Sequence, residues 1–359
     1  MKPYIPQKLP LDGIDWVDLI DDISKANRAL AKYDGYLQVI PNKELLLAPL
    51  TMKEAVLSSK IEGTQASFEE VLNYEANPKK NISNYNDIEE VINYKKAINY
   101  AVDRLNDLPL SSRLFKEIHK ILLSGVRGGN KSPGNFRTGQ VFIGKSGASI
   151  NEATFIPPQP QLIDEYISNL ENYIHFDEKD VLVQLAIIHA QFEIIHPFWD
   201  GNGRVGRILI PLFLFYKEVI STPMFYVSEF LESNRSDYYK YLSLVSKEKD
   251  WNSWIKFFLN AIYIQSNNNI QKIDKILSLY NQLKENIIDV PTPKNSIKVL
   301  DFLFSTPIFS AKLFTEKTDI GKRNVYRIID FLVNKEIIFP DDKERNKTYY
   351  FDKLLEIIS

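Results

Sequence analysis

The sequence predicts a mainly α-helical protein made of more than one unit. Apolar residues recur at helical spacing over most of the chain, and two strongly apolar segments, 181–195 and 208–216, have the length of buried helices. Residues 140–158 hold the one convincing β segment. A chain of 359 residues is long enough for two or three domains. We therefore expect a helical core with a small β-hairpin flap, preceded by a helical segment and followed by a further unit.

The composition is that of a soluble globular protein. Hydrophobic residues make up 44% of the chain and charged residues 25%, and the net charge of −2 argues against a surface that coats nucleic acid uniformly. The absence of cysteine excludes disulfides and thiol catalysis, and it suits a reducing cytoplasm. The start lacks the apolar stretch of a secretion signal, and the apolar runs are too short for a bilayer, which needs roughly 20 residues. These features predict a cytoplasmic protein with no membrane partner.

The N-terminal segment is expected to be helical after a proline-spaced extended start. Its predicted helices are 18–33, 51–62 and 68–74. Thr51 and Glu54 have the spacing of a capping box, in which each side chain satisfies an unpaired amide of the first turn. Gly63 is a natural stop at the other end of the same helix. Glu62 lies beside that stop, where the helix dipole opposes a carboxylate, so we expect another group to attract it.

The middle of the chain predicts a hairpin and then a helix. The two arms of the hairpin are 140–144 and 154–158, with a polar turn at 145–152 between them. A single helix is expected at 226–246, and it carries Asn234 and Tyr238.

The last 70 residues have a different organisation. After a proline-rich break, the expected elements are helices 296–304, 310–318 and 322–334 and strands 337–339 and 348–351, which form a winged-helix pattern. The third helix and the charged turn after the first strand carry six cations, Lys322, Arg323, Arg327, Lys343, Arg345 and Lys347. They suit phosphate contacts on DNA. No concentrated basic field accompanies them, which favours a protein-interaction or dimerisation module instead.

The most informative run is residues 196–207, HPFWDGNGRVGR, between the two apolar segments. It predicts a tight loop between two buried helices, with glycines at the start of the second. A helix N-terminus presents unpaired amides and a positive dipole end, so this loop is expected to bind phosphate. Arg204 and Arg207 can fork onto phosphate oxygens, and Asp200 can hold a Mg²⁺ that bridges them. His196 can take a proton from an attacking hydroxyl.

This run resembles the signature of Fic domains, H-P-F-x-D-G-N-G-R-x-x-R, and the match is complete. Fic enzymes transfer a nucleotide monophosphate, usually AMP from ATP, to a hydroxyl side chain of a target protein. The resemblance implies His196 as the base, Phe198 as a core anchor, Arg204 as a contact to the departing diphosphate and Arg207 as the clamp on the γ-phosphate. The magnesium ligand would be Asp200. The implied ATP-binding residues of the run are Asp200, Gly201, Asn202, Gly203, Arg204, Val205, Gly206 and Arg207.

Two further features of the resemblance concern the reaction. Gly203 is retained, whereas a branch that phosphorylates its target departs from the family pattern there, so AMP transfer is favoured. The string Ser58-x-x-x-Glu62-Gly63 resembles the inhibitory motif of Fic proteins, in which the glutamate pairs with the second arginine of the signature, here Arg207. Ser58 and Glu62 share a helix face. The resemblance therefore implies an enzyme that carries its own inhibitor upstream of the core.

The hairpin and the helix at 226–246 also have counterparts in the family. The hairpin resembles the Fic flap, whose exposed edge can pair with an extended target segment, and the docking residues would be Phe142, Ile143, Gly144 and Phe155. In the family the helix helps to wall the adenosine pocket, which makes Asn234 and Tyr238 candidates for base or ribose contacts. Buried aromatic residues at helical spacing are equally consistent with a core role.

The expected domains are a helical segment at 1–95 with the inhibitory motif at 58–63, a Fic core at 96–265, a linker helix at 266–289 and the winged-helix-like unit at 290–359. The expected activity is AMP transfer from ATP to a Ser, Thr or Tyr hydroxyl of a target protein or of the enzyme itself. Two alternatives stay open: a DNA-binding regulator whose Fic part senses nucleotide, and removal of AMP with Glu62 positioning water. A homodimer is also left open.

Overall fold

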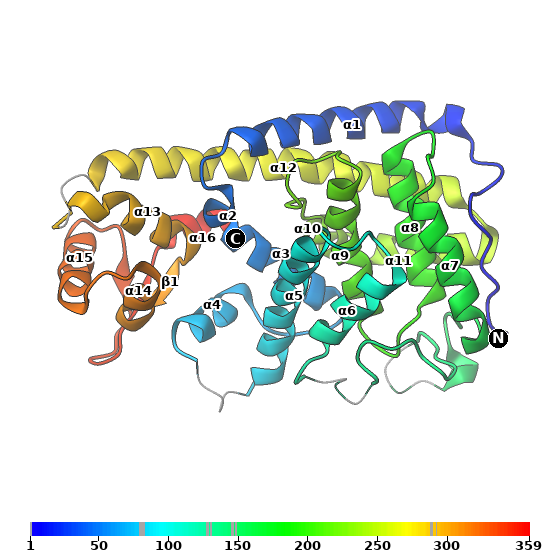
Figure 1. The fold of residues 1–359 in the computed structure, drawn as a ribbon, viewed down its shortest axis with the longest axis horizontal. Helices are drawn as coiled ribbons and strands as arrows, with labels where there is room; N and C mark the ends of the chain where they lie inside the picture. Colours follow the sequence, from blue (N-terminus) through cyan, green and yellow to red (C-terminus); the bar gives the residue numbers. More distant parts are fainter. Residues whose placement is uncertain are drawn as a thin grey trace.

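A computed structural model describes residues 2–78, 83–126, 129, 131–144, 147, 149–287, 290–291 and 293–359. Figure 1 shows an elongated bundle of helices, with the C-terminal unit at one end. The N-terminal helices are α1 (Trp16–Val39), α2 (Lys43–Leu46), α3 (Ala48–Ile61), α4 (Phe68–Ala76) and α5 (Tyr85–Arg104). The middle elements are α6 (Ser112–Leu122), η1 (Ile150–Glu152), η2 (Pro160–Leu162), α7 (Ile163–Ile174), α8 (Val181–Ile195), α9 (Asn202–Tyr216), α10 (Ser228–Ser233) and α11 (Arg235–Glu248). They are followed by α12 (Trp251–Asn286), η3 (Pro293–Asn295), α13 (Ser296–Ser305), β1 (Ile308–Ser310), α14 (Ala311–Thr318), α15 (Lys322–Asn334), β2 (Phe339–Pro340), β3 (Thr348–Tyr350) and α16 (Asp352–Ile358).

Helix α8 is largely apolar, and every residue of it except Val181 and Glu193 is buried. It packs against α7, α9, α11 and α12. The carboxylate of Asp180 starts this helix by accepting hydrogen bonds from the amides of Leu182 and Val183, both at 2.9 Å. The helix α12, of 36 residues, lies along α1 at the edge of the bundle (Figure 1). It runs without a break past residue 265, so residues 266–286 are its C-terminal part.

The helix that carries Ser58 starts earlier than the sequence predicts. Helix α3 begins at Ala48, with Pro49 in its first turn, so Thr51 already lies inside it. The predicted capping box of Thr51 and Glu54 is therefore wrong. The Thr51 hydroxyl lies 2.6 Å from the hydroxyl of Tyr226, and Glu54 is buried.

Two other predicted elements differ from the prediction, one by being divided and one by being shorter. The helix at 226–246 is two helices, α10 and α11, which break at Asn234, where the side-chain amide bonds the carbonyl of Phe230 at 2.9 Å. The hairpin is a single antiparallel bridge between Ile143 and Phe155. Pro157 and Pro158 have no amide hydrogen, so the returning arm cannot extend the ladder. Lys145, Ser146 and Ala148 of the predicted turn lie outside the described residues.

The C-terminal unit contains the three helices that the sequence predicts and the second predicted strand, as β3. The first predicted strand, 337–339, is shifted: β2 is Phe339–Pro340. The elements η3, β1 and α16 were not predicted. Its sheet is antiparallel in the order β1-β3-β2, with Phe309 opposite Tyr349. The unit packs against the N-terminal helices: β1 lies on α4, and α13 contacts α2 and α3. The hydroxyl of Tyr350 donates to Asn73 Oδ1 at 2.9 Å, and the hydroxyl of Ser310 donates to the carbonyl of Ala76 at 2.8 Å. No helix in the described part of the chain is long and apolar enough to cross a membrane.

Candidate active site

The signature forms a rigid loop between α8 and α9. Asn202, the first residue of α9, accepts from the amide of Phe198 at 2.8 Å and donates to the carbonyl of the same residue at 2.9 Å, which closes the loop on itself. Gly201 precedes the helix with φ 76°, a conformation that favours glycine. The first amides of α9 have no partner within the helix, and they lie at the end of a loop that is closed by its own side chain. This is the geometry of an anion site at a helix N-terminus.

His196 ends α8 in the left-handed region, with φ 48° and ψ 60°. Its ring Nδ1 lies 3.3 Å from the carbonyl of Glu193. A carbonyl can only accept, so Nδ1 carries the proton and Nε2 is left as the unprotonated nitrogen. Burial lowers the pKa of His196 to about 4, more than the Glu193 carbonyl and the Glu62 carboxylate raise it. The imidazole is therefore neutral near pH 7 and able to accept a proton at Nε2.

Asp200 lies at the mouth of the loop, with 47% of its side chain exposed. Its Oδ1 accepts from the amide of Gly201 at 2.5 Å and lies 3.4 Å from the Arg204 guanidinium. Its Oδ2 has no hydrogen-bond partner among the described residues. A single free carboxylate oxygen beside a phosphate site fits Mg²⁺, which proteins hold with one or two carboxylates together with substrate phosphates. In the described part of the chain, no group of three His, Cys, Asp or Glu residues could hold a metal by itself.

The two arginines of the signature are buried and engaged by carboxylates. Arg204 lies 3.3 Å from Glu90 of α5, in addition to Asp200. Arg207, 1% exposed, donates through Nη2 to Glu62 Oε1 at 2.7 Å. It also donates to the hydroxyl and the carbonyl of Ser58, both at 2.8 Å. The sequence-predicted residues Ser58, Glu62 and Arg207 are thus brought together across 145 residues of chain.

The Glu62 carboxylate also lies against the backbone of α9. A side chain at Gly203 would overlap with Glu62 Oε1, so the carboxylate occupies the space directly beside the first turn of the helix. Burial alone would raise the pKa of Glu62, but the groups around it, Arg207 foremost and then Arg204, together lower this pKa below its ordinary value. Glu62 is therefore an anion, and it lies at the positive end of α9 where a phosphate group would bind.

The sequence did not predict a role for His119 of α6, which packs against the signature loop. The amide of Gly134 donates to its Nδ1 at 2.9 Å, so Nε2 carries the proton and donates to the carbonyl of Asp200 at 3.0 Å. The ring stacks on Phe198 with centroids 3.8 Å apart. Burial lowers the pKa of His119 to about 4, which keeps this tautomer neutral.

Two glutamates near the site, the buried Glu54 and the partly buried Glu193, were also missed or misassigned. Glu54 accepts from the amide and the hydroxyl of Ser228, at 3.0 and 2.6 Å, and burial raises its pKa. It ties α3 to the start of α10. Glu193 lies one turn before His196, and burial raises its pKa to about 8, more than Arg207 lowers it. Its Oε1 is buried without a hydrogen-bond partner among the described residues and lies against Gly206.

The remaining predicted site residues lie in two places. In the flap, Phe142 and Ile143 are more than a third exposed, Gly144 is exposed, and Phe155 packs on Tyr4. Tyr238 is buried, and its hydroxyl lies 2.9 Å from Nε2 of His189, whose Nδ1 lies 3.1 Å from the carbonyl of Gly206. The hydroxyl of Tyr238 is therefore already hydrogen-bonded inside the protein. Val205 of the signature is buried in the core, so its side chain does not face a ligand, and Asn234 caps α10.

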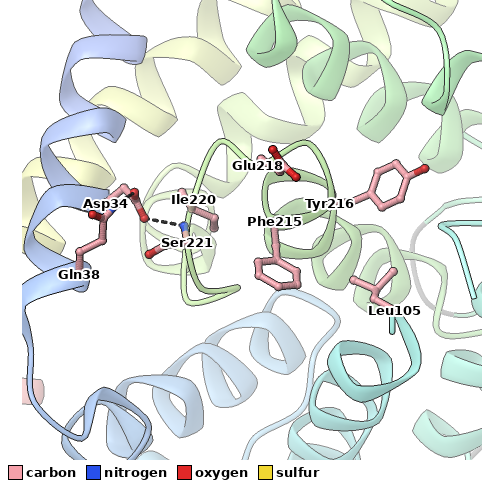
Figure 2. Close-up of a pocket in the computed structure, with 8 residues that line it drawn as sticks. All are labelled: Asp34, Gln38, Leu105, Phe215, Tyr216, Glu218, Ile220 and Ser221. Atoms are coloured by element: carbon pink, nitrogen blue, oxygen red, sulfur yellow. Dashed lines mark hydrogen bonds between the residues drawn. The ribbon is translucent and has the colours of Figure 1, made fainter. Parts of the chain in front are cut away.

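A separate cavity of about 410 Å³ lies at the opposite end of α9. Figure 2 shows it between α1 and the loop that follows α9, where Asp34 accepts a hydrogen bond from the amide of Ser221 at 2.6 Å. Phe215 and Tyr216 line it from the last turn of the helix. A helix of 15 residues is about 22 Å long, so this cavity is remote from the signature.

Comparison with protein families matches two consecutive models. Residues 20–103 match the Fic/DOC family N-terminal model, and residues 109–214 match the Fic/DOC family model. A probable protein adenylyltransferase of Aquifex aeolicus is 29% identical over 170 residues, which are 46% of this chain and 48% of that protein. A protein adenylyltransferase of Caenorhabditis briggsae is 30% identical over 149 residues, 38% of this chain and 25% of that protein. The chain thus spans half or less of the length of these relatives.

The fold has solved counterparts as well. A crystal structure of a Fic family protein from Desulfovibrio desulfuricans covers 98% of both chains with a TM-score of 0.59 and 16% sequence identity, which is a likeness of fold. The mainly helical class that the sequence predicts is confirmed. With the family's N-terminal model matched over α1 to α5 and its second model over the signature, this chain belongs to the Fic/DOC family.

Proposed function

We propose that this protein is an adenylyltransferase that moves AMP from ATP to a Ser, Thr or Tyr hydroxyl of a target protein or of itself. The observation that carries the proposal is His196, whose unprotonated Nε2 is free among the described residues at the N-terminal end of α9. A proton acceptor beside an anion-binding helix end is what hydroxyl attack on a phosphate ester needs. The names of the curated relatives support the same activity.

In the proposed reaction the acceptor oxygen attacks the α-phosphorus of ATP and its proton passes to Nε2 of His196. The bond from the α-phosphorus to the bridging oxygen breaks, and diphosphate leaves with its electron pair. The amides of Asn202 and Gly203 hold the α- and β-phosphates, and Arg204 offsets the charge that develops on the diphosphate. Asp200 would hold Mg²⁺, which when bound supplies further neutralisation of the phosphate charge.

We infer that the arrangement with Glu62 on Arg207 is an inhibited one. The γ-phosphate of ATP and the Glu62 carboxylate would both need the guanidinium of Arg207 and the space beside Gly203. The two anions cannot occupy that site together, because both need the same helix dipole and the same hydrogen-bond donors. Productive binding therefore requires Glu62 to move away. Displacement of Glu62 from Arg207, rather than a change in the signature loop, is the proposed route to activation.

The acceptor would dock on the flap. The amide and carbonyl of Ile143 already bond the returning arm, so the open edge for an extended segment would be the backbone of Phe142 and Gly144 on either side of it. The exposed side chains of Phe142 and Ile143 offer apolar contact, with little demand on the sequence of the segment. The C-terminal unit is proposed to act as a protein-interaction or dimerisation module, because its cations form no concentrated basic field. Within the chain, β1, α13 and α16 pack on α2, α3 and α4, so the unit contacts the helix that precedes Glu62. Because α15 carries cations, DNA binding is the alternative function of this unit. A gel shift across a salt series tests it.

The test of the activity uses ATP labelled at the α- or the γ-phosphate, with wild type, Glu62→Gly and His196→Ala. Label from the α-phosphate on the enzyme or on a target, increased by Glu62→Gly and abolished by His196→Ala, is the expected result. Equal labelling in all three proteins would contradict the proposal. Label that comes only from the γ-phosphate would mean phosphorylation. Loss of label from an already modified target, dependent on Glu62, would mean that the reverse reaction dominates.

A further inference from the structure

Arg137 is a buried cation whose guanidinium is bound by backbone carbonyls alone. It is 2% exposed and lies in the segment between α6 and the flap. None of the carboxylates in the described ranges forms an ion pair with it. Burial lowers the pKa of Arg137 to about 10, which still leaves it charged near pH 7. A charge buried this way is costly unless its hydrogen bonds are all satisfied, so its partners indicate what it is for.

One set of partners lies at the end of α8. Nε of Arg137 donates to the carbonyl of His196 at 2.8 Å, and Nη2 lies 3.4 Å from the carbonyl of Ile195. The amide of Arg137 donates to the carbonyl of Pro197 at 2.8 Å. A cation suits the negative end of a helix, and these bonds satisfy carbonyls that the helix itself leaves unpaired. They also hold His196 in the left-handed conformation, which costs a residue with a side chain about 1–3 kcal/mol.

The other set of partners lies at the base of the flap. Nη1 donates to the carbonyl of Gly139, before the first arm, at 3.0 Å. Nη2 donates to the carbonyl of Pro158, at the end of the returning arm, at 2.6 Å. Gly139 in turn lies so close to the ring of Trp199 that a side chain at this position would overlap with it. Both arms of the flap are thus joined to the signature loop through one planar group.

We propose that Arg137 is a positioning residue that sets the distance between the base and the segment on which the acceptor hydroxyl docks. This inference rests on the proposed function, in which the flap presents the hydroxyl and His196 takes its proton. The guanidinium fixes the backbone of both partners at once, so a small shift of either one displaces the hydroxyl from Nε2. Misplacement of reacting groups by about 1 Å can cost roughly a hundredfold in rate. Lysine keeps the charge but lacks the planar fork that reaches all four carbonyls.

The first test compares Arg137→Lys with Arg113→Lys, an exposed arginine of α6, both in the Glu62→Gly background. We expect Arg137→Lys to lower kcat for transfer of α-labelled AMP about a hundredfold, while Kd for ATP changes less than about twofold. In Arg137→Ala, added guanidinium ion should restore part of kcat, because it can refill the space between the carbonyls. Unchanged kcat in Arg137→Lys, or a parallel loss of ATP affinity, would overturn the positioning role.

The second test does not depend on activity. Hydrogen exchange is followed in peptides covering 137–144, 154–160 and 192–198, in wild type and in Arg137→Lys. The proposal predicts that exchange rises in all three segments together, while α1 and the C-terminal unit stay as they are. A rise confined to one segment, or spread over the whole chain, would overturn it. If Glu62→Gly itself transfers no AMP, the proposed function fails, but this measurement still decides whether Arg137 joins the base to the flap.

Discussion

The contact between Glu62 and Arg207 gives a quantitative expectation for ATP binding. Replacing Glu62 by glycine removes a charge-assisted hydrogen bond of 2.7 Å and vacates the space beside Gly203. Such a bond contributes about 1.5–3 kcal/mol, and each 1.4 kcal/mol is tenfold in affinity. The Glu62 side chain is 33% exposed, so the lower end of that range applies. We therefore expect Kd for ATP to fall about tenfold to thirtyfold.

The assay is calorimetric titration with ATP and Mg²⁺, in wild type, Glu62→Gly and Glu62→Gln. The glutamine variant keeps a neutral acceptor for Arg207, so its Kd should lie between the other two. Glu232→Gln is the matched control: it breaks another ion pair of α3, that of Lys60 with Glu232 at 3.5 Å, without touching Arg207. An unchanged Kd in Glu62→Gly, or a Kd that Glu232→Gln lowers as much, would contradict competition between Glu62 and ATP.

Three further outcomes are expected. Ser58→Ala removes one of the bonds that hold Arg207, so AMP transfer should rise a few-fold, less than in Glu62→Gly; no rise would mean that Ser58 does not help to hold the inhibited state. Burial raises the pKa of Glu193 from 4.5 to about 8, so the folded state keeps this proton while the unfolded chain loses it, and stability should fall as pH rises between these values. Glu193→Gln should therefore raise Tm more at pH 8 than at pH 5, and equal shifts at both would contradict the raised pKa. Glu54→Ala leaves the polar groups of Ser228 buried without their partner, and chemical denaturation should show a loss of about 1–3 kcal/mol; a loss below that range would mean that water replaces the carboxylate.

The parts of the site that are local in sequence could be predicted. The sequence at 196–207 contains the features that determine the shape of the loop. They are a glycine where φ is positive, an asparagine that bonds the backbone four residues earlier, and apolar flanking segments that form two buried helices. The pairing of Glu62 with Arg207 is not local. The helix dipole indicates only that Glu62 needs a partner. The identity of that partner followed from resemblance to a family.

Long-range polar contacts account for most of what the sequence did not predict. Glu54 has the spacing of a capping residue, but its partner Ser228 lies 174 residues away and no local pattern indicates it. Arg137 and His119 look like ordinary surface or helix residues until the backbone carbonyls around them are known. The short strand β1 was not predicted for a related reason. It has three residues, and only its pairing with β3 makes it a strand.

The order of Glu62 and Arg207 along the chain also matters for how the protein is made. Helix α3 leaves the ribosome before α9, because Glu62 precedes Arg207 by 145 residues, and N-terminal regions generally fold first during synthesis. When the signature arginine emerges, the carboxylate that neutralises it is already present. The partner of Arg207 is therefore supplied by a segment made earlier, and the burial of this arginine does not wait for any later part of the chain.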